Sequence, residues 1–256
     1  MRYSQIMKRM GFRKDQEGIM NRYMREKIHW DRHLENTRNF INRSFRDANP
    51  KSVAVLGSGW LLDIPVNEMS KRFEKIYLVD VLHPHQIRKR VGHIDNVELV
   101  EADLTGGAVE QLWQYTRDKT PLSEERFTHD VMFFNPLANL EYDVIISANL
   151  LNQLDIIVCD FLMKKGYFQQ QAPDHLRSRI QAFHIEWIKQ TPGCLITDTL
   201  EINLHDNTGE KSVKSLLYAE LPEGFRTEQW IWEFDTHGTY NEGSTTSMQV
   251  QAIEWH

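Results

Sequence analysis

Residues 53–63 read Val-Ala-Val-Leu-Gly-Ser-Gly-Trp-Leu-Leu-Asp, an apolar run followed by two close glycines and an acid. A short continuous apolar run bounded by turn residues is typical of a strand that is covered on both faces of a parallel sheet. Glycines directly after such a strand let the backbone approach a ligand closely. A helix is expected over residues 63–72, so the turn is predicted to present free amide groups at a helix N-terminus.

The same alternation continues after this stretch. Further strands are expected at residues 76–79, 97–100, 144–146 and 194–197, and further helices at residues 85–91, 107–117, 152–163 and 174–190. Two last strands, at residues 229–234 and 248–255, are expected to form a hairpin. Strands that alternate with helices predict a doubly wound parallel sheet with right-handed crossovers. The predicted fold class is therefore α/β, with a mostly parallel seven-stranded sheet that ends in an antiparallel hairpin.

The first part of the chain is expected to be helical. Apolar side chains recur at three- and four-residue steps between Trp30 and Phe45, and residues 1–47 as a whole predict helix. Asn49-Pro50 ends this pattern, because the residue before a proline disfavours the helical region. We predict an N-terminal helical extension over residues 1–49 and a Rossmann-like domain over residues 50–256.

Composition and charge limit the classes to which the protein can belong. No stretch approaches the roughly 18–20 uncharged apolar residues of a membrane span, and the N-terminus lacks the apolar core of a signal peptide. Cys159 and Cys194 lie in apolar runs and are expected to be free thiols, so a cytoplasmic location is expected. A net charge of -6 argues against a general nucleic-acid binder.

Three acids are predicted to meet at one crevice. Asp80 ends the second strand, where a carboxylate can accept both hydroxyl protons of a ribose. Asp103 follows the third strand and can accept from an adenine amino group, with Leu104 beside it. Asp63 would repel a pyrophosphate but can attract an ammonium, and Leu62 replaces the third glycine of a nicotinamide site. Ligands of open α/β sheets bind beyond the carboxyl ends of the strands, although each acid alone can also be a cap or a solvated side chain.

The ordered motifs resemble those of class I S-adenosylmethionine-dependent methyltransferases. They are Val-Leu-Gly-Ser-Gly (55–59), Tyr-Leu-Val-Asp (77–80), Glu-Ala-Asp-Leu (101–104) and Tyr-Asp-Val-Ile-Ile-Ser-Ala-Asn (142–149). The resemblance covers residues 50–256 and implies that S-adenosyl-L-methionine is the cofactor. It also implies that the N-terminal helix folds over the cofactor crevice as a lid.

The resemblance implies a set of cofactor-binding residues. They are Gly57, Ser58, Gly59, Asp63, Asp80, Val81, Asp103, Leu104, Ala148 and Asn149. The glycine turn flanks the methionine part, the acid after the second strand binds the ribose, and the pair after the third strand binds adenine. The segment 147–150 lines the methionine and faces the acceptor. The family usually has an acid where this chain has Val55, and Asp63 is expected to hold the methionine ammonium instead.

The catalytic group is not marked by any one residue type, because such a transfer needs mainly alignment of the acceptor. Candidates are Asn149, Asn152 and His205, which follow predicted strands. The two asparagines can hydrogen-bond an acceptor or cap a helix. His205 can act as a base near neutral pH or lie in a solvated loop, and Asp198 and Glu201 precede it.

His83 and His85 lack a third ligand, so no metal is expected. The favoured hypothesis is a methyltransferase acting on a small molecule or a peptide. A non-catalytic binding or interaction module with the same fold is a second hypothesis, because Val55 departs from the family pattern. A nicotinamide oxidoreductase is a third, disfavoured by Leu62 and Asp63. Neither a membrane nor a nucleic acid is an expected partner, and the oligomeric state is not indicated.

Overall fold

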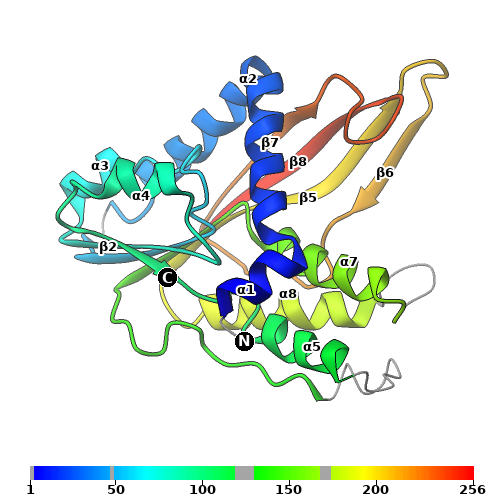
Figure 1. Cartoon of the computed structure of the whole chain (residues 1–256). Helices are drawn as coiled ribbons and strands as arrows, with labels where there is room; N and C mark the ends of the chain where they lie inside the picture. The colour runs from blue at the N-terminus through cyan, green and yellow to red at the C-terminus, as the bar shows by residue number, and fades with distance from the viewer. Residues whose placement is uncertain (1–2, 47–48, 119–129, 168–173) are drawn as a thin grey trace.

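The computed structural model describes residues 3–46, 49–118, 130–167 and 174–256 (Figure 1). The helices are α1 (Tyr3–Met10), α2 (Phe12–Arg43), α3 (Val66–Arg72), α4 (His85–Val91), α5 (Ala108–Arg117), η1 (Leu151–Gln153), α7 (Ile156–Lys164) and α8 (Asp174–Ile188). The strands are β1 (Ser52–Leu56), β2 (Lys75–Asp80), β3 (Val97–Glu101), β4 (Val144–Ala148), β5 (Gly193–His205), β6 (Lys211–Ser215), β7 (Arg226–Asp235) and β8 (Ser244–Trp255). Strands and helices alternate up to β5, as predicted.

One mixed sheet runs through the molecule in the strand order β3-β2-β1-β4-β5-β8-β7. The strands from β3 to β5 pair in parallel, and β8 lies antiparallel between β5 and β7. The chain runs outward from β1 to β3 and then returns to β4 on the other side of β1. This return creates a topological switch point between β1 and β4, where open α/β sheets bind their ligands. The strand order confirms the predicted doubly wound sheet with its terminal hairpin.

The two faces of the sheet have separate hydrophobic cores. Successive side chains of a strand point to opposite faces, so Val53 and Val55 join one core while Ala54 and Leu56 join the other. Helices α2, α3 and α4 contribute to the first core, and α1, α5, α7 and α8 to the second (Figure 1). All four side chains are buried, which explains why the apolar run in β1 is continuous rather than alternating.

The N-terminal segment forms two helices where one was expected. Gly11 has a φ of +102°, a left-handed conformation that favours glycine, and it separates α1 from α2. Helix α1 buries Ile6 and Met7 in the core on the α5 side. Helix α2 packs along β7, where Trp30 Nε1 donates to the Phe234 carbonyl oxygen at 2.9 Å. The segment therefore contributes to both cores, while the domain boundary at residue 49 stays a prediction.

Other boundaries also differ from the prediction. The helix expected from residue 63 begins at Val66, after Pro65 at its N-cap, because a residue before proline is kept out of the helical region. The helix expected over residues 152–163 is divided into η1 and α7. The fifth strand continues to His205 and pairs with β6, so the described sheet has eight strands rather than seven. Strand β6 is exposed along its length, and no burial pattern marks it in the sequence.

The segment expected to be irregular, residues 118–141, is described in part. Residues 131–141 form neither helix nor strand, as predicted, and residues 119–129 lie outside the described residues. Among the residues that the structure describes, no helix is both long enough and apolar enough to cross a membrane.

Candidate functional site

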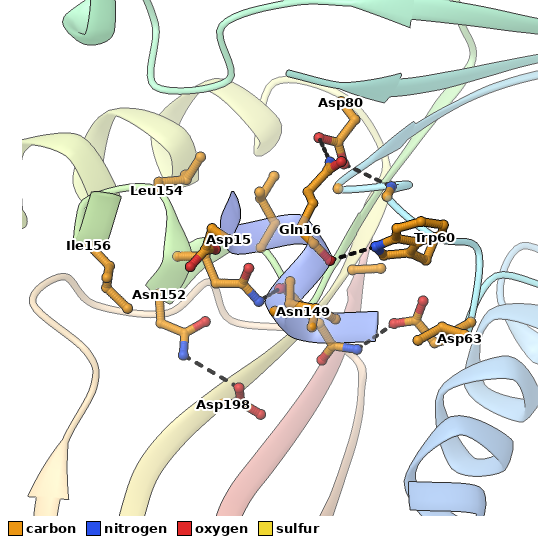
Figure 2. Close-up of a pocket in the computed structure, with 18 of the residues that line it drawn as sticks. Asp15, Gln16, Trp60, Asp63, Asp80, Asn149, Asn152, Leu154, Ile156 and Asp198 are labelled. Carbon is orange, nitrogen blue, oxygen red and sulfur yellow. Dashed lines mark hydrogen bonds between the residues drawn. The ribbon is translucent and has the colours of Figure 1, made fainter. Parts of the chain in front are cut away.

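A cavity of about 340 Å³ lies beyond the carboxyl ends of β1, β2, β3 and β4 and beside the middle of β5 (Figure 2). This volume is within the range of pockets that hold small molecules. Its walls also include side chains from α2, β7 and β8. The ten residues expected to bind the cofactor all line it: Gly57, Ser58, Gly59, Asp63, Asp80, Val81, Asp103, Leu104, Ala148 and Asn149. The structure thus brings together side chains that are far apart in the sequence.

The glycine turn after β1 is shaped by close contact with β4. Gly57 has a φ of +77°, and a Cβ atom there would lie 2.8 Å from the Ala148 carbonyl oxygen. The amides of Gly57 and Ser58 donate to the Val79 carbonyl oxygen at 3.0 and 3.2 Å. The prediction of free amides at a helix N-terminus is therefore wrong, because the turn amides bind β2 and α3 begins only at Val66.

Asp80 lies at the end of β2 and is almost fully buried. Its carboxylate accepts from the Gly59 amide at 2.8 Å, from the Val81 amide at 2.7 Å and from Gln16 Nε2 at 3.2 Å. Burial raises the pKa of Asp80 to about 6, and these hydrogen bonds act in the opposite direction. The carboxylate is thus held rigidly at the edge of the cavity.

Asp103 follows β3 and keeps one oxygen free. Its Oδ1 accepts from the Thr105 amide at 3.0 Å and from the Thr105 hydroxyl. Its Oδ2 is buried and has no hydrogen-bond partner among the described residues. Burial raises the pKa of Asp103, while the hydrogen bonds from Thr105 lower it. This arrangement fixes the carboxylate and leaves an acceptor for a ligand.

Asp63 and Asn149 meet across the cavity. Asn149 has a φ of +48° at the end of β4, and its Nδ2 donates to Asp63 Oδ2 (Figure 2). Burial raises the pKa of Asp63, whereas the hydrogen bond from Asn149 lowers it. Val55 is fully buried in one of the two cores and offers no polar group to the cavity. Asp63 thus adds a second carboxylate to this part of the cavity, beside Asp80.

The cavity continues past the end of β4 and along the middle of β5. Asn152 Nδ2 donates to Asp198 Oδ2 at 3.4 Å, and Glu201 also lines this part. Burial, together with the nearby charge of Asp63, raises the pKa of Asp198 to about 7. Trp232, Phe234 and Tyr240 form an aromatic wall here (the β7 wall). Figure 2 shows Asp80 and Asp198 on opposite sides of the segment of α2 that carries Asp15 and Gln16.

Seven buried side-chain atoms of cavity-lining residues have no hydrogen-bond partner among the described residues. They are Gln16 Oε1, Arg22 Nε, Asp103 Oδ2, Asn149 Oδ1, Asn152 Oδ1, Asp198 Oδ1 and Trp232 Nε1. Buried polar atoms are normally paired, and each unpaired one calls for an explanation. Five of the seven are oxygens, so the cavity suits a ligand that supplies several N–H or O–H donors.

Two of the three catalytic candidates line the cavity, and the third does not. Asn149 and Asn152 lie in its wall, whereas His205 Nδ1 accepts from the amides of Asn207 and Thr208 in the turn between β5 and β6. His83 Nε2 lies 3.1 Å from the Ser58 hydroxyl, beneath the glycine turn. Within the described ranges, no group of three His, Cys, Asp or Glu side chains is placed to hold a metal ion.

The N-terminal helix was expected to fold over the crevice, and side chains of α2 line the cavity, but Gln16 was not expected among them. Gln16 and Arg22 lie in a strongly charged helix, and only the packing of α2 over the strand ends brings them into the cavity. The Gln16 side-chain amide also donates to the Leu82 backbone carbonyl oxygen at 3.0 Å. The Gln16 backbone carbonyl oxygen accepts from Trp60 Nε1 at 2.7 Å. The place of these two side chains depends on tertiary packing, and the local pattern of residues 12–22 does not indicate it.

No family model and no curated protein matches the chain. Among solved structures, DhpI in complex with SAH is 11% identical, with 94% of this chain and 95% of that chain covered and a TM-score of 0.38. The N-methyltransferase NodS from Bradyrhizobium japonicum WM9, in complex with S-adenosyl-L-homocysteine, is 11% identical over 85% of each chain, with a TM-score of 0.34. The methyltransferase domain of bacterial CtHen1 is 12% identical over 85% of this chain and 99% of that chain, with a TM-score of 0.35. Such values carry no functional conclusion, and the Rossmann-like fold is assigned from the strand order of the sheet.

Proposed function

We propose that this protein is an S-adenosyl-L-methionine-dependent methyltransferase with a small-molecule acceptor. The observation that carries the proposal is the convergence of Gly57, Asp80 and Asp103 on one cavity at the switch point of the sheet. These three residues follow three different strands, and a single nucleoside ligand that spans the strand ends explains why they meet.

The donor groups of the cofactor match the carboxylate and amide oxygens that line the site. S-adenosyl-L-methionine carries an ammonium, two ribose hydroxyls and an adenine amino group. Asp80 would hold the ribose, and Asp103 Oδ2, which has no partner, would accept from the adenine amino group. Asn149 Oδ1, also unpaired, and the neighbouring Asp63 would receive the ammonium. The apolar surfaces of Val81, Leu104 and Ala148 would line the rest of the ligand.

The chain's own contribution to the reaction is placement. The cofactor supplies a methyl group on a positively charged sulfur, which needs only a well-aligned nucleophile. Asn149 and Asn152 lie where the cofactor part of the cavity meets its β5 part, so they are proposed to orient the acceptor. Helix α2 covers the cavity with Gln16, Arg22 and Trp30, which helps exclude water. Buried free thiols at Cys159 and Cys194 support the proposed cytoplasmic location.

Titration calorimetry tests the cofactor assignment. Adenosylmethionine and adenosylhomocysteine are expected to bind with one-to-one stoichiometry, and NAD is expected to give no heat, because Asp63 would repel its pyrophosphate. Heat from NAD alone would show that the assignment is wrong. Incubation of cell extract with methyl-labelled cofactor then separates an enzyme from a non-catalytic binding module, for which cofactor binds and no label is transferred.

A further inference from the structure

A β-bulge in β5 places two carboxylates on the same side of the sheet. Asp198 pairs with Val250 and Leu200 pairs with Gln249, so Thr199 is an extra residue on β5. In a regular strand, residues 198 and 201 would point to opposite faces, because side chains alternate. The extra residue shifts the alternation by one position, so both side chains point to the same face. Asp198 and Glu201 both line the cavity.

The two carboxylates differ in what they already bind. Glu201 accepts from Asn203 Nδ2 at 2.9 Å, from Asn241 Nδ2 at 3.0 Å and from the Tyr240 hydroxyl at 3.4 Å. Asp198 is 4% exposed and accepts a long hydrogen bond from Asn152; its Oδ1 has no partner in the part of the chain that the structure describes. Asn152 Oδ1 is buried and unpaired as well. Two neighbouring oxygens thus remain available for N–H groups of a bound molecule.

The β7 wall already holds a cation. The Arg22 guanidinium lies 4.5 Å from the ring centroid of Phe234 and 4.9 Å from that of Tyr240, which is the geometry of cation–π contacts. Phe234 and Tyr240 meet edge to face at 5.0 Å. These rings therefore form a surface that accepts positive charge, and the Tyr240 hydroxyl donates to the Glu201 carboxylate of β5.

The charge balance of the cavity favours a cationic occupant. Among the described residues that line the cavity, Arg22 is the only Lys or Arg, and the acidic side chains are Asp15, Asp63, Asp80, Asp103, Asp198 and Glu201. The proposed cofactor site uses Asp63, Asp80 and Asp103. The remaining three carboxyl groups outnumber the single guanidinium, so an anionic acceptor would meet net repulsion.

We propose that the acceptor is an amine, which binds as its ammonium between Asp198, Asn152 and the β7 wall, and that Asp198 accepts the proton before methylation. The inference rests on the proposed function, since it names the acceptor class of that same site. A base whose pKa lies near neutrality, as that of Asp198 does, is suited to taking a proton at physiological pH.

The step balances without another reactant. One N–H proton passes from the ammonium to the Asp198 carboxylate, which leaves a lone pair on nitrogen. That lone pair forms the new bond to the methyl carbon, and the electrons of the broken carbon–sulfur bond stay on sulfur as a neutral thioether. The methylated ammonium carries the positive charge, and Asp198 returns its proton to solvent.

Three ligands that share a phenyl ring and differ at the polar end test the inference: phenethylamine, 2-phenylethanol and phenylacetate. Binding is measured by calorimetry, with and without adenosylhomocysteine. We expect phenethylamine to bind more tightly than the other two, and Asp198→Asn to weaken it by about ten-fold or more, since a hydrogen bond to a charged partner is lost. Asp206→Asn, an exposed acid outside the cavity, is the matched control.

A second variant tests the aromatic part of the site. Arg22→Ala vacates the β7 wall and is expected to strengthen phenethylamine binding, with no gain for phenylacetate. The inference is overturned if the alcohol or the carboxylate binds as tightly as the amine, if no amine binds, or if Asp198→Asn leaves amine affinity unchanged in a variant that melts like the parent. Adenosylhomocysteine binding without amine binding would leave the proposed function standing. If the amine binds in a way that depends on Asp198 but adenosylhomocysteine does not bind, the amine site would stand and the proposed cofactor would be wrong.

Discussion

Gln16 Nε2 donates to Asp80 Oδ1 at 3.2 Å, so a side chain of α2 contacts the carboxylate proposed to bind the ribose. The same side-chain amide donates to the Leu82 backbone carbonyl oxygen. The backbone carbonyl oxygen of Gln16 accepts from Trp60 Nε1. Helix α2, the end of β2 and the glycine turn are therefore joined by one hydrogen-bond network. A ribose that binds Asp80 must share this carboxylate with Gln16 or displace it.

Asp80→Asn tests the proposed ribose contact. Loss of the buried charged acceptor is expected to lower affinity for adenosylhomocysteine by about 10- to 100-fold, the cost of a hydrogen bond to a charged group. Calorimetry measures the affinity, and Asp206→Asn serves as an exposed control of the same chemistry. Equal affinity of the Asp80 variant and the parent protein would remove the ribose role.

Gly57→Ala tests the close approach of the glycine turn to β4. A Cβ atom at Gly57 would lie 2.8 Å from the Ala148 carbonyl oxygen, whereas one at Gly209, with a φ of +67°, would meet nothing within 4 Å. Both substitutions carry the left-handed penalty of about 1–2 kcal/mol, and only Gly57→Ala adds a steric clash. Urea denaturation should show the larger loss for Gly57→Ala, and similar losses for the two variants would show that the close approach costs nothing.

The fold was predictable where burial leaves a pattern. The continuous apolar runs of β1, β2 and β4 and the helix α4 were placed within one or two residues, because both faces of the sheet are covered. Strand β6 was missed because Lys-Ser-Val-Lys-Ser is exposed along its length and pairs only with the far half of β5. The break at Gly11 was missed because a single glycine inside a helical pattern is also compatible with a continuous helix.

The site was predictable where a residue follows a strand. Asp80, Asp103 and Asn149 were found because the carboxyl ends of parallel strands meet at one edge. Gln16 was not found, since its place depends on how α2 packs over that edge. The shared orientation of Asp198 and Glu201 depends on a bulge, which the sequence does not indicate. The amides of the glycine turn were expected to be free, but they bind β2 and Asp80.

Asp198→Asn is expected to stabilise the protein without ligand at alkaline pH. Burial raises the pKa of Asp198 from 3.8 to about 7, so the native state prefers the protonated form. The contribution of protonated Asp198 to the free energy of unfolding is fully present below pH 3.8 and is lost as pH rises through about 7. Asparagine does not ionise, so the variant avoids this loss. The difference in free energy of unfolding between the variant and the parent should be about 2 kcal/mol more in favour of the variant at pH 8.5 than at pH 5.5.

Urea denaturation at the two pH values measures this gain, with Asp206→Asn as the control that should show no such pH dependence. A variant that loses stability more at pH 8.5 than at pH 5.5 would indicate that Asp198 is a favourably bound carboxylate in the native state.

Arg177→Met is expected to destabilise the fold beside the cavity. Asp155 is 1% exposed and pairs with Arg177 and with Gln181, which in turn binds the Leu216 carbonyl oxygen. Removal of one partner of a buried ion pair leaves an uncompensated charge, at a cost of about 3–5 kcal/mol. Arg13→Met, which breaks an exposed pair with Glu17, should cost less than about 1 kcal/mol by the same denaturation measurement. Equal losses would show that the Asp155 pair is not desolvated.

A crystal structure of the complex with adenosylhomocysteine tests the central claim most directly. We expect the nucleoside across the ends of β1, β2 and β3, with a ribose hydroxyl at about 2.5–3.0 Å from the Asp80 carboxylate and the adenine amino group at about 2.7–3.2 Å from Asp103 Oδ2. A nucleoside bound elsewhere, or bound in this cavity with neither carboxylate in contact, would contradict it.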